Sequence, residues 1–132
     1  MSQLPEIIRT IDRVSADVVA KASTFQAAIL SDVAGPRGPL PCRVGPVPPN
    51  LAAGGPAFTV EVRPGDNLMI HAAIALAQPG DVLVIDGKGD QTAALMGTLM
   101  LSACKKRGLA GVIVDAAIRD KLEILELDFP VF

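Results

Sequence analysis

Short runs of consecutive aliphatic residues, separated by helix-like stretches, constrain the fold of this chain more than any other feature. The runs at 82–85 and 112–114 lack the polar alternation of a half-exposed strand, and 57–62 is a further strand candidate. Strands without polar alternation are typical of parallel sheets that are buried on both faces. The sequence therefore predicts an α/β fold with a mostly parallel central sheet that is covered on both faces.

Helices are expected between these strands. Residues 68–77 form a nearly all-apolar helix that Asp66 should cap, and we expect this helix to be buried on most sides. A helix over 97–107 should end at Gly108, because glycine adopts the left-handed conformation found after helices. The last two elements are expected to be a short helix over 119–127 and a strand over 129–132.

The N-terminal third differs from the rest of the chain in its residue pattern. An apolar stripe at helical spacing predicts a helix over 5–22, and a second short helix is expected over 25–30. Residues 35–50 hold six of the eleven prolines and three glycines. Because proline fixes φ and lacks an N–H donor, we expect this segment to be a surface connector. With 132 residues, the chain is expected to form one domain, 1–132.

Composition argues against several classes of function. Trp and Tyr are absent, and the only basic run, Lys105-Lys106-Arg107, suits the end of a helix, so direct nucleic-acid binding is not expected. The N-terminus carries charge where a signal peptide is apolar, and no apolar stretch approaches the ~20 residues of a membrane span. We therefore expect a cytoplasmic protein without a membrane partner. Its aliphatic surface should favour self-association.

The available side chains restrict metal chemistry. Cys42 and Cys104 match neither a zinc spacing nor a disulfide framework, and Cys104 is expected in the core. His71 is the only histidine, and its apolar helix favours a packing role over catalysis. A metal would therefore need oxygen ligands, which favours Mg²⁺ or Mn²⁺. The candidate carboxylates are Asp86, Asp90, Asp115, Asp120 and Glu123.

Two glycine-containing stretches could meet an anion. Residues 87–92 follow a strand, but Thr92 stands where a dinucleotide fold has its third glycine, and the Walker A spacing fails. A tight strand-to-helix turn over 86–90 is the favoured interpretation, and a nucleotide site is not expected. Residues 97–100 could instead open a helix whose free N–H groups face a carboxylate.

The stretch 114–120 leaves a buried strand and places Arg119 beside Asp120 at a helix start. Arginine recognises carboxylates and enolates through two parallel hydrogen bonds, and Asp120 could hold a metal beside it. A purely structural role fits equally well, because an aspartate in the first turn of a helix caps free N–H groups. Both interpretations remain open at the level of the residues.

At these residues the sequence resembles the RraA-like family, which includes 4-hydroxy-4-methyl-2-oxoglutarate / 4-carboxy-4-hydroxy-2-oxoadipate aldolases and the ribonuclease-activity regulator RraA. The resemblance extends over most of the chain from about residue 24. It rests on five ordered segments, which are 54–60, 64–71, 78–84, 107–115 and 118–132.

The resemblance implies a swivelling-type β/β/α domain in trimeric rings, often hexamers, with active sites between subunits. It implies a metal-dependent lyase that cleaves a 4-hydroxy-2-oxo acid to release pyruvate and that decarboxylates oxaloacetate. Asp120 would be the metal ligand, and Arg119 would neutralise the oxyanion. Backbone amides would bind the pyruvyl carboxylate at Gly97, Thr98, Leu99 and Met100.

The sequence departs from the aldolase pattern in two places. The aldolase fingerprint is an acidic residue, twenty intervening residues and then Arg-Asp, and Thr98 occupies the acidic position. Asp90 could compensate for the carboxylate that Thr98 lacks. The family also normally continues past Phe132, with a tail that supplies a further acidic residue from the neighbouring subunit.

These departures keep alternatives in view. One is a non-catalytic regulator that binds ribonuclease E or another protein, and another is a relative acting on a different 2-oxo or 2-hydroxy acid. Some relatives are named as demethylmenaquinone methyltransferases, but residues 87–89 are the only candidate for an S-adenosylmethionine site and are not followed by the expected acidic strand end.

Overall fold

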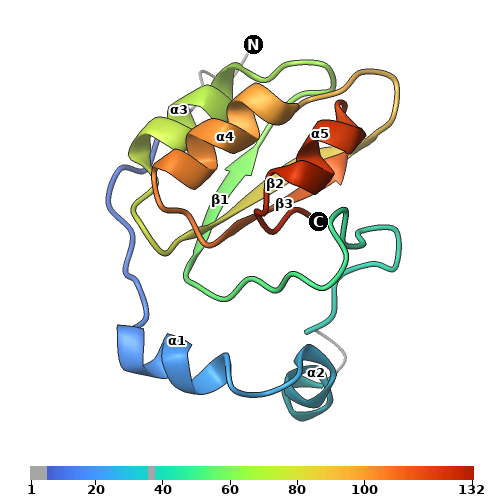
Figure 1. Cartoon of the computed structure of the whole chain (residues 1–132). Helices are drawn as coiled ribbons and strands as arrows, with labels where there is room; N and C mark the ends of the chain where they lie inside the picture. Colours follow the sequence, from blue (N-terminus) through green and yellow to red (C-terminus); the bar gives the residue numbers. More distant parts are fainter. Residues whose placement is uncertain (1–5, 36–37) are drawn as a thin grey trace.

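The computed structural model describes residues 6–35 and 38–132, and its centre is a parallel three-stranded sheet in the order β1-β2-β3 (Figure 1). The strands are β1 (Ala57–Glu61), β2 (Val82–Asp90) and β3 (Gly111–Ala116). The predicted parallel α/β fold is therefore confirmed. The expected loop at 86–90 is wrong, because β2 continues to Asp90 with a register irregularity after Ile85.

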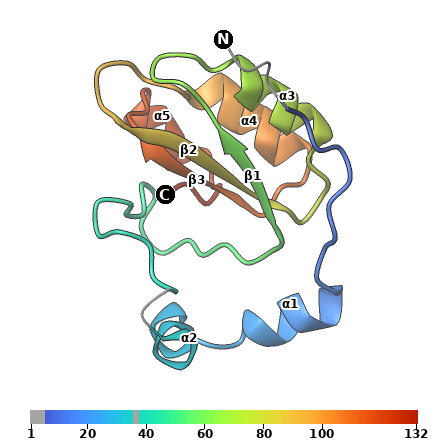
Figure 2. The same cartoon turned by 180° about the vertical axis from the view of Figure 1, so that it is seen from behind.

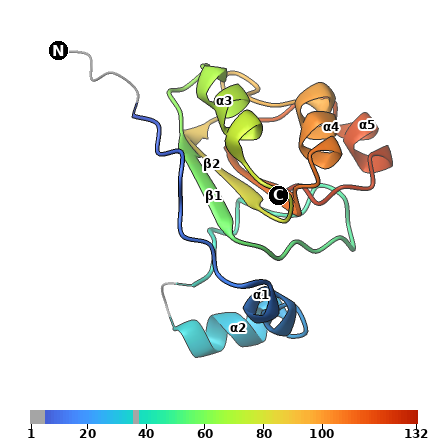
Figure 3. The ribbon, with the colours of Figure 1, turned by 90° about the vertical axis from the view of Figure 1, so that its left-hand side faces the viewer.

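Three helices cover the sheet from one side only (Figure 3). They are α3 (Leu68–Leu76), α4 (Thr98–Lys106) and α5 (Lys121–Glu126). The expectation of a sheet covered on both faces is wrong for a topological reason. When parallel strands follow one another in the order of the sequence, successive right-handed crossovers all place their helices on the same face.

The core lies between the sheet and these helices. Phe58, Leu83 and Val112 are in register across the three strands, and all three are buried. The next residues along β2 and β3, Val84 and Ile113, are in register on the opposite face and are only partly buried. The sheet thus has one well-covered face and one poorly covered face. Figure 2 shows the poorly covered face.

The N-terminal helices α1 (Ala16–Ala22) and α2 (Ala27–Ala34) stand away from the sheet and bury none of their residues (Figures 1 and 3). A helix over 5–22 is wrong for residues 6–15, which run extended alongside β1, whereas residue 5 lies outside the described part. Tertiary contacts override the helical pattern here, because Ile11 packs against the core cluster and Arg13 is held by a buried carboxylate.

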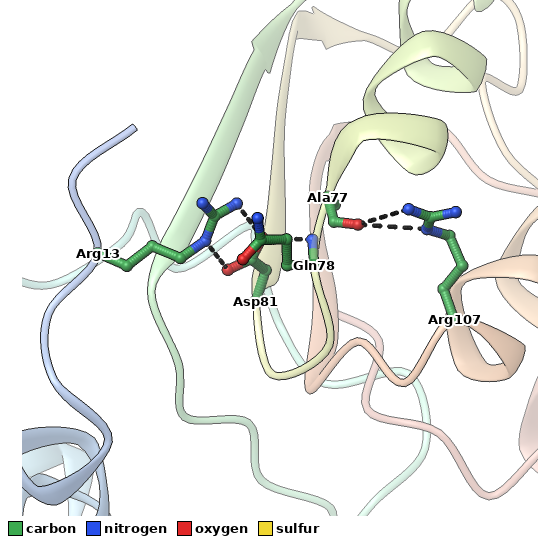
Figure 4. Close-up of polar contacts among 5 residues, drawn as sticks. All are labelled: Arg13, Ala77, Gln78, Asp81 and Arg107. Atoms are coloured by element: carbon green, nitrogen blue, oxygen red, sulfur yellow. Dashed lines mark hydrogen bonds and ion pairs between the residues drawn. The ribbon is translucent and has the colours of Figure 1, made fainter. Parts of the chain in front are cut away.

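That carboxylate belongs to Asp81, directly before β2, and the Asp81 side chain is 1% exposed (Figure 4). Arg13 donates from Nε and Nη2 to its two oxygens, each at 2.8 Å, and the Gln78 N–H donates to Oδ2 at 2.8 Å. From the other side of the same turn, the Arg107 guanidinium donates to the carbonyl of Ala77. Two arginines from distant segments therefore fix the turn between α3 and β2.

We expect Asp81→Asn to destabilise the fold at neutral pH and to lose this effect in acid. Burial tends to raise the pKa of Asp81, but the hydrogen bonds from Arg13 and Gln78 and the Arg13 charge hold it below the ordinary value of 3.8. A lowered pKa in the folded state contributes stability above 3.8, and this contribution disappears as the pH falls through the folded-state value. Urea midpoints of wild type and variant should therefore converge as the pH falls below 3.8 and through the lowered pKa of Asp81.

Asp32→Asn, at an exposed position of α2, is the matched control and should leave the urea midpoint unchanged. An Asp81→Asn variant with the wild-type midpoint at neutral pH would contradict the stabilising role of the Arg13–Asp81 pair.

The proline-rich segment forms no helix or strand in its described residues, 35 and 38–50, as expected, and residues 36–37 lie outside the described part. It returns to the body of the domain through Val47, whose N–H donates to the carbonyl of Val131. Val131 forms a parallel bridge with Val112 of β3, so the expected final strand is reduced to a short pairing. Across the described ranges, no helix combines the length and apolar character needed to cross a membrane.

Candidate functional site

Two backbone segments distant in the sequence lie side by side where α4 begins. The N–H of Leu95 donates to the carbonyl of Ala117 at 2.9 Å, and the N–H of Arg119 donates to the carbonyl of Met96 at 3.0 Å. An isolated parallel bridge joins Met96 and Ile118 between these bonds. This short ladder places the pair Arg119-Asp120 against the first turn of α4.

Asp120 caps α4 rather than its own helix. Its Oδ2 accepts a hydrogen bond from the N–H of Thr98, the first residue of α4, at 3.1 Å. The Asp120 backbone is left-handed, with φ 65° and ψ 40°, and makes no side-chain cap on α5. The structural role anticipated for Asp120 is therefore present, but on the neighbouring helix.

Gly97 makes this arrangement possible through its missing side chain. A Cβ atom at this position would lie 2.5 Å from Oδ2 of Asp120 and 3.1 Å from Cγ of Arg119. The first distance is shorter than real Cβ contacts, so any larger residue would displace the carboxylate. The φ of Gly97 is −150°, which any residue adopts, so the requirement for glycine here is steric.

The start of α4 can accept an anion. The first hydrogen bond back to its N-cap is donated by Leu101 to the carbonyl of Gly97, so the N–H groups of Leu99 and Met100 precede the intrahelical ladder. A carboxylate, that of Asp120, already occupies the N–H of Thr98. Helix N-termini favour negative charge through their free N–H groups and the helix dipole.

Arg119 lies beside this helix start and is free to meet a ligand. Its side chain is 73% exposed, and its Nε is 3.8 Å from Oδ2 of Asp120, whose own side chain is 37% exposed. The structure thus brings together all the predicted site residues, which are Gly97, Thr98, Leu99, Met100, Arg119 and Asp120.

Two of the other candidate carboxylates are engaged in ion pairs. Asp86 accepts hydrogen bonds from the side chain and backbone of Lys88, which lower its pKa. Asp115 is held by Arg43 in a two-bond ion pair at 2.9 and 2.7 Å, which lowers the pKa of Asp115. Their positions at the carboxyl end of the sheet agree with the sequence, but neither is a free ligand.

The remaining two candidates differ from each other. Asp90 accepts hydrogen bonds at Oδ1 from the side chain and backbone of Thr92, which lower its pKa, while its Oδ2 is buried and has no partner among the described residues. Glu123 is exposed in the first turn of α5. Within residues 6–35 and 38–132, no three Asp, Glu, His or Cys residues form a metal cluster.

The oxygen donors at the site fit a weakly held hard cation. Asp120 engages the helix through one oxygen, which leaves Oδ1 for a metal, and the side-chain oxygen of Thr98 is buried without a partner among the described residues. Mg²⁺ is commonly bound by one or two carboxylates, with water and substrate oxygens completing its shell. The residues present are therefore compatible with Mg²⁺ or Mn²⁺ held mainly by Asp120.

The histidine and the buried cysteine have no part in this site. His71 is exposed on α3, so the expected packing role is wrong, because the helix buries only Ile70, Ala73 and Ile74. Cys104 is fully buried, and burial raises the pKa of its thiol to about 12, which confirms its place in the core.

Sequence reasoning missed Arg43, the ion-pair partner of Asp115. Arg43 belongs to the proline-rich connector and is 72 residues away from Asp115 in the chain. No local pattern marks it, because the contact depends on where the connector crosses the sheet. The steric role of Gly97 was equally invisible, although a glycine directly before a helix that meets an Arg-Asp pair is a usable signal.

This fold and site define an α/β domain in which a helix N-terminus, an arginine and an aspartate lie together on one surface. The chain belongs to the RraA-like family: the family model described as Aldolase/RraA matches residues 14–132.

Relatives in this family have different names. A protein of Halalkalibacterium halodurans, provisionally named 4-hydroxy-4-methyl-2-oxoglutarate aldolase, is 40% identical over 116 residues, which cover 88% of this chain and 55% of the relative. The chain thus spans about half the length of that relative.

The solved structures that resemble this chain also carry different functional names. The RNA-processing inhibitor RraA from Thermus thermophilis is 28% identical with a TM-score of 0.70, covering 81% of this chain and 65% of that one. A structure from Geobacillus kaustophilus described as an S-adenosylmethionine:2-dimethylmenaquinone methyltransferase is 37% identical with a TM-score of 0.63, covering 70% and 55%.

Proposed function

We propose that this protein is a divalent-metal-dependent lyase that releases pyruvate from a 4-hydroxy-2-oxo acid and decarboxylates oxaloacetate. The observation that carries the proposal is the convergence of Arg119, Asp120 and the start of α4, where the N–H of Thr98 already holds a carboxylate. The aldolase name of the Halalkalibacterium halodurans relative supports the same activity.

The residues suggest how a 2-oxo acid would bind. Its carboxylate would take the N–H groups of Leu99 and Met100, in the field of the helix dipole. The Arg119 guanidinium would then face the 2-oxo oxygen, where negative charge develops as the bond between C3 and C4 breaks and its electrons form the enolate. In the aldol cleavage the 4-hydroxyl group would lose its proton and C4 would leave as a carbonyl compound, whereas in the decarboxylation of oxaloacetate C4 would leave as CO2. Pyruvate is released after a proton reaches C3.

Asp120 would hold the metal through the oxygen that does not cap α4. When bound, Mg²⁺ or Mn²⁺ would polarise the 2-oxo group as a Lewis acid. Gly97 keeps space for the carboxylate between the helix start and Arg119, so the charge and the anion donors remain adjacent.

The direct test is pyruvate release from oxaloacetate and from 4-hydroxy-4-methyl-2-oxoglutarate, measured with Mg²⁺, with Mn²⁺ and with EDTA. The proposal requires metal-dependent release above the uncatalysed background. A wider panel of 2-oxo and 2-hydroxy acids separates a lyase with another substrate from an inactive protein. Absence of release from every substrate would remove the lyase proposal.

We expect Thr98→Glu to strengthen metal binding by at least about tenfold, because it adds a second carboxylate beside Asp120. Titration of Mn²⁺ followed by electron paramagnetic resonance would measure the affinity independently of activity. Thr98→Gln is the control, because glutamine has the size of glutamate without its charge. This variant should leave the Mn²⁺ affinity unchanged. Equal gains in both variants would show that the carboxylate is not responsible.

Self-association as a trimer or hexamer is part of the proposal. The site is exposed in the single chain, and two exposed leucines, Leu99 and Leu122, flank it. A second copy over this surface would limit the access of bulk water, which would strengthen the electrostatic interactions of the site. Sedimentation as a stable monomer at assay concentration would contradict this assembly.

A second candidate is a protein-binding regulator that acts on ribonuclease E or another partner. The observations that favour it are Thr98 at the acidic position of the aldolase pattern and the likeness to the RNA-processing inhibitor of Thermus thermophilis. Inhibition of purified ribonuclease E by the chain, without pyruvate release, would support this candidate. An Asp120→Asn variant should leave such inhibition intact.

A further inference from the structure

The outer edge of β1 has hydrogen-bonding groups without strand partners. The Val62 N–H donates to the backbone carbonyl of Asp86, and the Val82 N–H donates to the carbonyl of Pro56. The backbone N–H and C=O groups of the even-numbered residues along β1 therefore face β2. Because alternate residues of a strand direct their backbone groups to opposite edges, those of Thr59 and Glu61 face outward. Within the described ranges no backbone group of another segment bonds to this outer edge.

A groove of about 840 Å³ runs beside this edge, between β1, α3 and the extended segment 6–12. Figures 2 and 3 show that segment beyond the outer edge of β1, running from near α3 toward α1. The groove walls are mainly aliphatic, with contributions from Ile7, Ile8, Ile11, Val60, Met69 and Leu76. A strand added to β1 would therefore find an apolar trough for every second side chain.

The rim of the groove carries an excess of negative charge. Its carboxylates belong to Glu6, Asp12, Glu61 and Asp66, against the cations Arg63 and Lys88. Lys88 is already bound to Glu61 at 2.8 Å and to Asp86 at 2.7 Å, so its charge is largely compensated. The rim is complementary to basic side chains.

We propose that the outer edge of β1 is a docking site for an extended polypeptide strand whose residues alternate between aliphatic and basic. Its backbone would pair with Thr59 and Glu61, its aliphatic side chains would enter the groove, and its basic side chains would meet the rim carboxylates. The site is separate from Arg119-Asp120 in residues and does not depend on the lyase activity.

The probe is a fluorescein-labelled octapeptide of alternating lysine and valine, titrated into the full chain and followed by fluorescence anisotropy. We expect saturable binding that weakens with salt, because the rim contacts are ionic. The same peptide with glutamate in place of lysine should bind at least about tenfold more weakly. A version N-methylated at alternate residues, which cannot pair with a strand, should also lose at least about tenfold.

The matched variants are Thr59→Pro, which removes an outward N–H and leaves the β1–β2 ladder intact, and Thr59→Val, which keeps it. Binding lost in the first and kept in the second supports the proposal, with far-UV circular dichroism to confirm folding. If Thr59→Pro does not fold, the N-methylated peptide decides the question on the unchanged protein. Equal binding of all peptides, no binding, or self-association through β1 that Thr59→Pro abolishes would overturn the proposal.

Discussion

Asp120→Asn is expected to reduce kcat/KM for pyruvate release by at least about 100-fold. The substitution separates the two roles of this side chain. An asparagine oxygen can still accept the hydrogen bond from the N–H of Thr98, and asparagine tolerates the left-handed backbone of this position. The start of α4 should therefore keep its shape, while the negative charge that would hold the metal is lost.

Two measurements make this prediction specific. The urea midpoint of Asp120→Asn should match that of wild type, whereas Mn²⁺ affinity should fall together with activity. Asp128→Asn is the control, because Asp128 also has a positive φ, is exposed, and lies just beyond α5. Full activity in Asp120→Asn, or equal losses in both variants, would refute the assigned role.

Leu83→Ala should lower the free energy of unfolding by about 3 kcal/mol. Leu83 has no exposed surface and lies at the centre of the sheet, in register with Phe58 and Val112 beneath the helices. Its truncation removes apolar contacts and leaves a cavity that the neighbouring strands cannot close.

Val84→Ala, one residue further along β2, is the informative comparison. Val84 points to the opposite face of the sheet, where it is only partly buried, so the expected loss is about 1 kcal/mol. Urea unfolding monitored by circular dichroism would give both values from the midpoints if the slopes agree. Equal losses for the two variants would mean that both faces of the sheet are covered in solution.

Several features of the fold were predictable because their physical causes are local. The aliphatic runs marked β2 and β3, since continuous aliphatic runs without polar alternation are typical of parallel strands. Gly108 ended α4 as expected, because its φ of +78° is readily adopted only without a side chain. The Arg119-Asp120 pair was also recognisable, because the two residues are adjacent in the chain.

Other features depend on contacts between distant segments, which no local pattern contains. The apolar stripe over 5–22 is compatible with a helix, yet residues 6–15 are extended because Arg13 reaches Asp81, 68 residues away. The order of the strands, and not their composition, put every sheet-covering helix on one face.

The site shows the same division most clearly. The sequence by itself determined which residues carry the charge and the anion donors, since these are properties of Arg119, Asp120 and a helix that begins at Thr98. Only the tertiary structure decided that Asp120 caps α4 instead of α5, because that choice depends on the ladder between 95–96 and 117–119 and on the missing side chain of Gly97. Chemical type is local to a residue, whereas the partner of a carboxylate is decided by the packing that brings two segments together.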